Sequence, residues 1–288
     1  MRNNDSYLSN NESNPLFALS RKVHTLAQAN NLKSNLDLAN YVIKSPAYQE
    51  TSLRLHLAPN QIDRTLLVQA LVHTSFHHEF NSKIEPLEHN EQLEFLGDSV
   101  ISLMITTLIY QQFPTMSEGD LSKLRSSLVN KDVLGELGEY LQLDRLILVG
   151  RGEIKRWGHN LEAIPRSLLT SAFEALIGVL YLQLGFKQTL AVMKNIIDQY
   201  SEVSGVPFIN QERLDDFDPK SRLQEITMAL YKQLPVYHDQ VAGSKFTVSL
   251  TIGERLIGEV SSNSKREAKQ QLSLMALKQL KGEGALSC

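Results

Sequence analysis

The chain has 288 residues, of which 42% are hydrophobic and 21% charged, and its formal net charge is −3. This composition is typical of a globular protein with one large or two modest domains. The only cysteine is Cys288, which excludes a disulfide framework or a cysteine-based metal site within one chain. No uninterrupted apolar run is long enough to cross a bilayer, so we expect no membrane segment. The polar N-terminal segment predicts a cytoplasmic location.

Residues 1–47 are predicted to form an N-terminal extension. Its first part, to about residue 14, is rich in Asn and Ser and almost lacks apolar side chains, which is typical of a disordered tail. From Phe17 to Tyr41 apolar residues recur at helical spacing, with a break at Asn30 and Asn31, which predicts two short helices. Whether these helices pack on the main domain or on a partner is left open by the sequence.

The next predicted helix runs from Ile62 to Phe76, after a break at Pro59 and Asn60. The histidines in and after it are His73, His77 and His78. We interpret His73 as a polar core or interface residue and the other two as loop residues, in preference to metal ligands.

The segment from His89 to Tyr110, HNEQLEFLGDSVISLMITTLIY, concentrates acids at the head of an apolar helix. Glu91, Glu94 and Asp98 stand at i, i+3 and i+7, so they share one helix face. The predicted apolar stripe beside them consists of Leu93, Leu96, Val100, Leu103 and Met104.

Three carboxylates on one face repel one another, and no Lys or Arg occurs between Glu88 and Lys123 to pair with them. We therefore expect a cation at this face, and Mg²⁺ is the simplest candidate because it prefers carboxylate oxygens. A solvated acidic face is the alternative interpretation. Gly97 lies between the acids and is a poor helix former, which favours the close approach of a backbone or a ligand.

Helices are also predicted from Ser117, which is a plausible N-cap with Asp120 at the third helical position, to Leu141. The following segment, Leu146 to Glu153, is predicted to be a short extended piece ending in a turn. Ile154 to Arg166 is predicted to be a polar loop.

The segment from Ser167 to Leu184 is predicted to be a strongly apolar helix with a single acid, Glu174. A lone carboxylate in apolar surroundings is costly unless it is paired or bound to a metal. Glu174 is therefore the best match for the acids of the His89–Tyr110 segment.

The composition changes after residues 203–216, which are predicted to be a linker because apolar periodicity lapses there. Residues 217–282 contain ten Lys and Arg against six Asp and Glu, so this part is net positive on a net negative chain. Its predicted order is α-β-β-β-α, and residues 283–288 are a tail. The elements are a helix at Pro219–Leu230, strands at Val236–Gln240, Lys245–Ile252 and Leu256–Ser261, and a helix at Asn263–Leu280. Basic residues at the start of the last helix favour phosphate binding.

Taken together, these motifs resemble the bacterial ribonuclease III family. The most specific is HNEQLEFLGDSV at His89–Val100, and LLVQALVHTSF, SEGDLSKLRSSLVN and FEALIG match family blocks in the same order. DPKSRLQE and NSKREAKQ match the double-stranded-RNA-binding domain of the family. The resemblance implies a mainly α-helical endonuclease domain at 48–202, followed by a small α+β double-stranded-RNA-binding domain at 217–282.

The resemblance also assigns roles to residues. It makes Glu94, Asp98 and Glu174 ligands of a catalytic Mg²⁺, for which Mn²⁺ is a possible substitute, and places Glu91 and Glu118 in the cleavage valley. Asp98, Glu174, Glu91 and Glu118 are thus the candidate catalytic acids. The expected RNA-binding residues are Gln224, Glu225, Lys245, Lys265, Arg266 and Lys269.

The resemblance further implies a homodimer that cuts both strands of duplex RNA, leaves 5′-phosphate ends and short 3′ overhangs, and processes structured precursors. Phe95 is the candidate dimer contact; in a monomer it is more simply a core aromatic.

One position departs from the family pattern. Ser171 stands where the family has an aspartate, three residues before Glu174. Because a serine hydroxyl is a weak, neutral Mg²⁺ ligand, metal affinity is expected to fall unless another acid such as Glu162 substitutes. The alternative function is therefore a weakened or inactive relative that binds duplex RNA as a structural protein. Five of the six expected acidic positions are still acidic, which favours cleavage.

Overall fold

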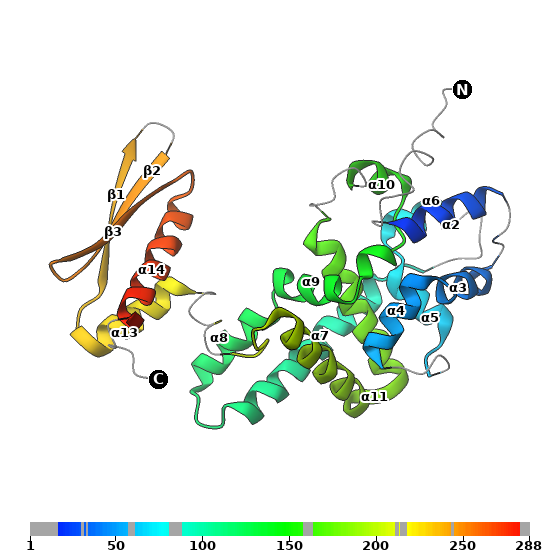
Figure 1. Ribbon diagram of the computed structural model, residues 1–288, viewed down its shortest axis with the longest axis horizontal. Coiled ribbons are helices and arrows are strands. Elements are labelled where there is room, and N and C mark those ends of the chain that lie inside the picture. Colours follow the sequence, from blue (N-terminus) through cyan, green and yellow to red (C-terminus); the bar gives the residue numbers. More distant parts are fainter. Residues whose placement is uncertain are drawn as a thin grey trace. The chain divides into compact units, whose positions relative to one another are not determined.

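The computed structural model describes residues 17–29, 32, 34–56, 61–80, 88–157, 164–210, 213, 218–242 and 245–282. The chain forms two compact units, one of residues 1–115 and 128–208, the other of residues 116–127 and 209–288. Helices make up the first unit, and the second carries the three-stranded sheet (Figure 1). This confirms the predicted fold class, mainly α-helical and then α-β-β-β-α.

The first unit is built from ten helical elements within its described residues. They are α2 (Ala18–Gln28), α3 (Asn35–Ile43), α4 (Pro46–Leu55), α5 (Arg64–Leu71), α6 (Thr74–Phe80), α7 (Glu91–Gln112), α9 (Lys131–Tyr140), the 3₁₀ turn η1 (Leu143–Arg145), α10 (Arg151–Trp157) and α11 (Arg166–Ser204).

Polar caps fix several helix starts. Ser34 and Asp37 form a capping box, with the Asp37 amide donating to the Ser34 hydroxyl and the Ser34 amide to the Asp37 carboxylate, each at 3.1 Å. The Asp120 amide donates in the same way to the Ser117 hydroxyl at 3.1 Å. This confirms the predicted cap of α8 (Glu118–Leu128), most of which belongs to the second unit.

The two predicted N-terminal helices exist as α2 and α3 and pack on the rest of the first unit. Phe17, Val23, Leu38 and Val42 have no exposed surface. The amide of Phe17 also donates to the carbonyl oxygen of Asp144 at 3.2 Å. The predicted disordered tail lies outside the described residues.

The prediction of a single helix at Ile62–Phe76 was wrong. The segment forms two helices, α5 and α6, because the chain between them forms a parallel bridge from Val72 to Leu148. The amide of Leu148 donates to the carbonyl oxygen of Leu71 at 2.8 Å, and that of His73 donates to the carbonyl oxygen of Leu148 at 2.9 Å. Backbone groups that pair across the fold are not available to continue a helix.

The polar loop predicted at Ile154–Arg166 was also wrong in its first part. Residues Arg151–Trp157 form α10, whose Ile154 is buried, and the candidate substitute Glu162 lies outside the described residues. The helix predicted at Ser167–Leu184 extends to Ser204 as α11. It bends at Gly185, whose φ of 71° and ψ of 171° suit only glycine.

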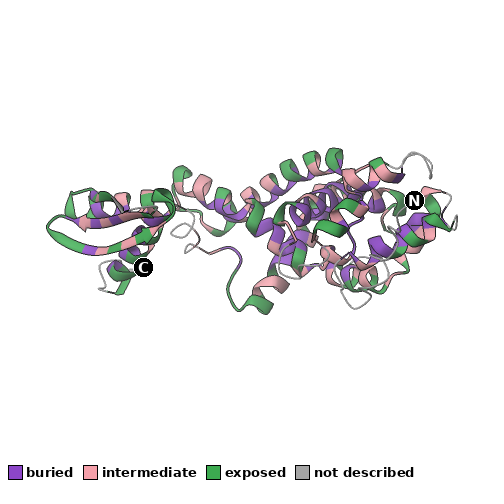
Figure 2. Ribbon diagram, turned by 90° about the horizontal axis from the view of Figure 1, so that it is seen from above, coloured by how far each residue is buried: buried purple, intermediate pink, exposed green. Residues whose placement is uncertain are grey.

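Within the first unit α11 packs most extensively on α7 and then on α9. Buried residues occur on most of the described helices (Figure 2). By length and composition alone, α7 and α11 could each cross a membrane. Most of the apolar stretch of α11 that meets this criterion is, however, buried within the unit. In α7 the predicted stripe is only partly right. Leu93, Val100 and Met104 are buried, whereas 56% of Leu103 is exposed.

The second unit has its own core. Its sheet is antiparallel in the order β1 (Pro235–Ala242), β2 (Lys245–Ile252), β3 (Arg255–Ser262). Helices α13 (Pro219–Tyr231) and α14 (Lys265–Gly282) pack together, and α14 lies against β2 and β3. Val248, Leu250 and Ile252 alternate along β2 and are buried, as the alternating pattern predicted.

Candidate active site

Helices α7 and α11 cross so closely that their backbones touch. A Cβ atom added to Gly97 would lie 1.7 Å from the carbonyl oxygen of Glu174, and one added to Gly178 would lie 2.4 Å from that of Leu93. Cβ atoms do not approach other atoms within 3.0 Å, so only glycine fits at either position. The expected close approach of a backbone at Gly97 is confirmed, and it brings Glu174 to the acids of α7.

Glu174 is 9% exposed in the middle of the apolar helix α11. The pKa of its carboxyl is raised to about 7, mainly by burial and in addition by the nearby carboxylates of Asp98 and Glu94, against the opposing charge of Lys131. In the absence of a metal, about half of the Glu174 carboxyl groups therefore carry a proton near neutral pH.

Glu94 carries the second perturbed carboxyl, and its hydrogen-bond partner is Ser171 of α11. Burial raises the pKa of Glu94, as do the charges of Glu91 and Asp98, whereas the hydrogen bond from Ser171 and the charge of Lys131 lower it. The serine hydroxyl thus contacts the acid cluster at the position where the resemblance predicts an aspartate. It adds a hydrogen bond there but no charge.

Lys131 was missed as a functional residue by the sequence analysis, which placed no base near the acids. It is the first residue of α9, and its charge acts on both Glu94 and Glu174. The hydroxyl of Thr170 donates to the carbonyl oxygen of Lys131 at 2.7 Å, which fixes the start of α9 beside Ser171. That contact joins residues far apart in the sequence, so no local pattern could have indicated it.

The other candidate acids differ in their surroundings. Asp98 and Glu91 are exposed on α7, and a carboxylate oxygen of Glu91 lies 3.6 Å from Nδ1 of His89. Glu118 begins α8, most of which belongs to the second unit. The acid cluster of the first unit is therefore Glu91, Glu94, Asp98 and Glu174.

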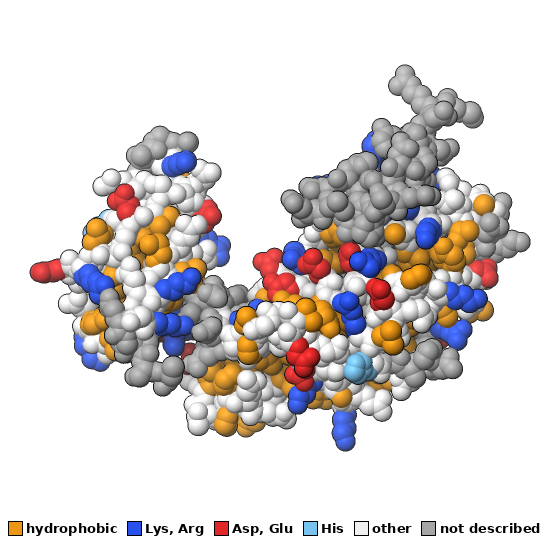
Figure 3. All heavy atoms as spheres, viewed as in Figure 1, with side chains coloured by type: hydrophobic (Ala, Val, Ile, Leu, Met, Phe, Trp, Pro, Cys, Tyr) orange, Lys and Arg blue, Asp and Glu red, His pale blue; other side chains and the backbone are white. Residues whose placement is uncertain are grey.

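The basic residues expected to bind RNA lie on the second unit. Lys and Arg side chains gather over α13 and α14 (Figure 3). A groove at the start of α14 is lined by Asp218, Lys220, Lys265, Arg266, Lys269 and Gln270. Asp239 of β1 forms ion pairs with Lys265 and, at 3.2 Å, with Lys269, and these partners lower the pKa of Asp239. The ion pairs orient two of the expected phosphate ligands along one edge of the groove.

The remaining expected RNA contacts are spread over the same unit. Gln224 and Glu225 lie on α13, and Lys245 begins β2 as an exposed residue. Glu225 forms ion pairs with Lys123 of α8 and, at 3.4 Å, with Arg222. Glu225 is thus already paired within this unit.

Comparison with known proteins gives matches for both units. A ribonuclease-III-like family model matches residues 63–200, and a double-stranded RNA binding motif matches residues 219–280. The Ribonuclease 3 of Borreliella burgdorferi is 36% identical over 222 residues, which cover 74% of this chain and 84% of that protein. The Ribonuclease 3 of Natranaerobius thermophilus is 34% identical over 229 residues, covering 76% of this chain and 91% of that protein. This chain belongs to the ribonuclease III family.

The family places the chain among ribonuclease III-type endonucleases that carry a double-stranded-RNA-binding domain. A solved nuclease domain of ribonuclease III from Campylobacter jejuni is 32% identical and covers 53% of this chain and 96% of that chain, with a TM-score of 0.46.

Ribonuclease III-type nucleases use a divalent metal, and the donors of the acid cluster fit a hard cation. Carboxylate and hydroxyl oxygens are the ligands that such ions prefer. The pKa values of Glu94 and Glu174 are raised mainly by burial and in addition by the charges of neighbouring carboxylates of the cluster. Among the described residues, no three His, Cys, Asp or Glu side chains are already arranged to hold a metal ion.

We expect the metal-free protein to lose stability as the pH rises through neutrality. The pKa of Glu174 is raised from 4.5 to about 7, so between these values the folded state binds more protons than the unfolded state. The free energy of unfolding should therefore fall by about 3 kcal/mol between pH 4.5 and 8 on account of this group. Urea unfolding titrations with a metal chelator present, repeated at several pH values, measure this free energy of unfolding.

Glu174→Gln should flatten this pH dependence because glutamine does not titrate. Glu202→Gln, at an exposed position of the same helix, should retain it. An unchanged pH dependence in Glu174→Gln would contradict the raised pKa.

Proposed function

We propose that this chain is a Mg²⁺-dependent, homodimeric endoribonuclease that cuts double-stranded RNA in structured precursors, with Mn²⁺ able to replace Mg²⁺. The observation that carries the proposal is the α7–α11 crossing, which sets buried Glu174 beside Glu94 and Asp98 in a chain with a double-stranded RNA binding motif. A binding module alone would need no buried carboxylate against two others.

The residues of the cluster have distinct parts in this reaction. Glu94, Asp98 and Glu174 would hold the ion, which supplies an activated water for in-line attack on the phosphodiester and neutralises the departing oxygen. Ser171 orients the Glu94 carboxylate through its hydrogen bond. Lys131 favours the ionised forms of Glu94 and Glu174, and exposed Glu91 borders the path of the substrate.

A second copy of the chain is the proposed partner of α7. Phe95, Leu103 and Tyr110 are 79%, 56% and 70% exposed, and their spacing puts them on one side of the helix. Large apolar side chains aligned in this way mark an interaction surface more often than a solvated face. Because Phe95 is exposed, it is not a core aromatic of the single chain.

A second candidate function rests on Ser171. The serine leaves the cluster one carboxylate short of the family pattern, which supports a protein that binds duplex RNA and cuts it slowly or not at all. The next two experiments separate these functions.

Asp98→Asn and Glu174→Gln should each abolish cleavage of a long RNA duplex, because losing an anionic ligand removes several kcal/mol of metal-derived stabilisation, roughly a thousandfold in rate. Affinity for the duplex, measured without divalent metal, should stay close to that of the wild type. Glu202→Gln is the matched control and should cleave normally. Absence of cleavage by the wild-type protein at every Mg²⁺ and Mn²⁺ concentration would refute the first function.

Ser171→Asp should lower the Mg²⁺ concentration needed for half-maximal cleavage by about tenfold, because it restores a charged oxygen ligand. Ser167→Asp adds the same charge one turn earlier on α11 and should not have this effect. The Mg²⁺ requirement of each variant is measured from its cleavage rate at increasing Mg²⁺ concentrations. If Ser171→Asp needed the same Mg²⁺ concentration as the wild type for half-maximal cleavage, another group would already serve as the missing ligand.

Phe95→Asp should convert the dimer to a monomer, weakening self-association by about a hundredfold or more, because a charge would enter an apolar contact. Leu53→Asp alters a side chain that is 74% exposed on α4, away from the α7 stripe, and should leave the dimer intact. Sedimentation velocity over a range of concentrations distinguishes the two. Equal association of both variants would contradict the assignment of Phe95 to the interface.

A further inference from the structure

Helix α2 has buried polar side chains as well as buried apolar ones. Ser20 and His24 have no exposed surface, as is also true of Val23 on the same helix. The family match begins at residue 63, so α2 lies outside the segment shared with the ribonuclease-III-like model. Buried polar groups need hydrogen-bond partners, and these partners show which part of the nuclease unit α2 contacts.

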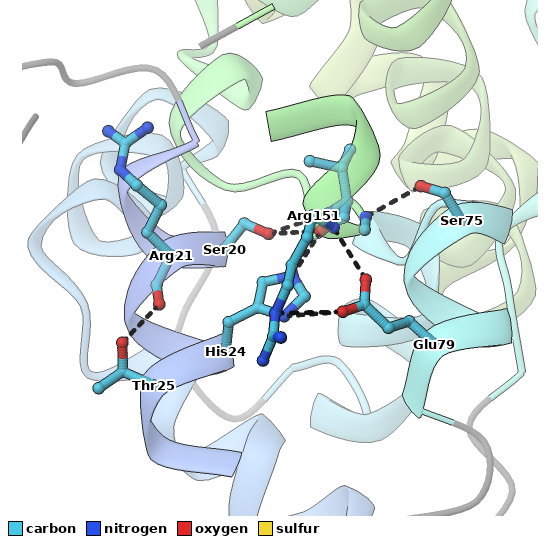
Figure 4. A network of polar contacts seen from close by, with 9 residues as sticks. Ser20, Arg21, His24, Thr25, Ser75, Glu79 and Arg151 are labelled. Carbon is cyan, nitrogen blue, oxygen red and sulfur yellow. Dashed lines mark hydrogen bonds and ion pairs between the residues drawn. The ribbon is translucent and has the colours of Figure 1, made fainter. Parts of the chain in front are cut away.

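Both side chains bind the backbone of a single residue, Val149 (Figure 4). The hydroxyl of Ser20 donates to the carbonyl oxygen of Val149 at 2.8 Å and accepts from its amide at 3.1 Å. Nε2 of His24 lies 2.9 Å from the same carbonyl oxygen and must carry the proton, because a carbonyl only accepts. The imidazole packs against the stacked rings of Phe76 and Phe80, with ring centroids 5.5 and 4.7 Å away.

The same contacts continue along the next two residues. The amide of Gly150 donates to the hydroxyl of Ser75 at 2.9 Å, and the amide of Arg151 donates to the carboxylate of Glu79 at 2.8 Å. Three consecutive backbone amides are therefore each bound by a side chain, from α2 in the first case and α6 in the other two. This arrangement fixes the path of the chain through Val149 and Gly150, which belong to no helix or strand, up to the start of α10 at Arg151.

That fixed segment is tied to the start of α7. Leu148, the residue before it, forms the parallel bridge to Val72. The carbonyl oxygen of Val72 accepts from the amide of Asn90 at 2.9 Å, and Asn90 is the residue that precedes Glu91. A short series of backbone contacts thus leads from α2, through Val149, Leu148 and Val72, to the first turn of the helix that carries the acids.

We propose that Ser20 and His24 are positioning residues of the nuclease site. By holding Val149 they fix the Val72–Leu148 bridge, and through it the first turn of α7 with Glu91 and Glu94. The bond from Ser171 to Glu94 and the packing of Gly97 on Glu174 both depend on where this helix begins. A displacement of about 1 Å at a reacting group costs about a hundredfold in rate, so a remote hydrogen bond can govern catalysis.

The test uses the full-length protein and four variants. Ser20→Ala and His24→Leu remove the bonds to Val149, and His24→Gln keeps an Nε2 donor of similar reach. Thr25→Ala is the matched control, because the hydroxyl of Thr25 binds only the carbonyl of Arg21 within α2. The measurements are kcat and KM on an RNA duplex with Mg²⁺, calorimetric binding of Mn²⁺ to the RNA-free protein, and thermal unfolding.

The catalytic readout rests on the proposed function. In Ser20→Ala and His24→Leu, kcat should fall by about ten- to a hundredfold with KM unchanged, and Mn²⁺ should bind several-fold more weakly. His24→Gln should restore both values toward the wild type, and Thr25→Ala should match it. Ser20→Ala removes a single oxygen atom, so it decides the question if His24→Leu does not fold.

The proposal is overturned if both variants keep wild-type kcat and Mn²⁺ affinity well below their melting temperatures, since α2 would then only add stability. A fall in RNA affinity alone, with kcat unchanged, would overturn it as well. If the wild-type protein cleaves no RNA, the proposed function fails, and the comparison of Mn²⁺ affinities still tests the positioning role.

Discussion

The contact on which the nuclease unit depends is the backbone crossing of α7 and α11. Gly97 rests against the carbonyl of Glu174, and Gly178 rests against that of Leu93. Without side chains at these two positions, the helix axes come close enough for carboxylates from both to share one small region. Any larger residue would push the helices apart and separate Glu174 from Glu94 and Asp98.

This crossing imposes an electrostatic cost on the fold. Burial and mutual repulsion raise the pKa of Glu94 and Glu174, so the apolar core around α11 must hold together charges that would otherwise separate. Lys131 and the Ser171 hydroxyl offset part of that repulsion, and a divalent cation would offset much more. Carboxylates held together in this way are a common feature of functional sites, and a divalent metal is what the family implies here.

The nuclease unit extends beyond the segment that matches the family. Helix α2 contributes buried polar side chains that bind Val149, so this helix of the N-terminal extension is packed into the same unit as the acids. The RNA-binding unit, in contrast, has a separate core of β2, β3, α13 and α14, and Asp239 orients its basic groove from β1. Recognition and chemistry thus rest on different cores.

Features that depend on neighbouring residues could be predicted from the amino-acid sequence. The i, i+3, i+7 spacing put Glu91, Glu94 and Asp98 on one helix face, the Ser117 cap began α8, and alternation predicted the buried side of β2. The lone acid in an apolar helix also singled out Glu174.

Features that depend on residues distant in the chain could not be predicted in this way and became visible in the folded chain. The Val72–Leu148 bridge broke a predicted helix, Lys131 joined the acids through Thr170, Ser171 became the partner of Glu94, and α2 was placed on Val149. Hydrophobic periodicity records which side of an element is buried, but it carries no information about which other element covers that side. That choice is made by packing and by hydrogen bonds between segments far apart in sequence.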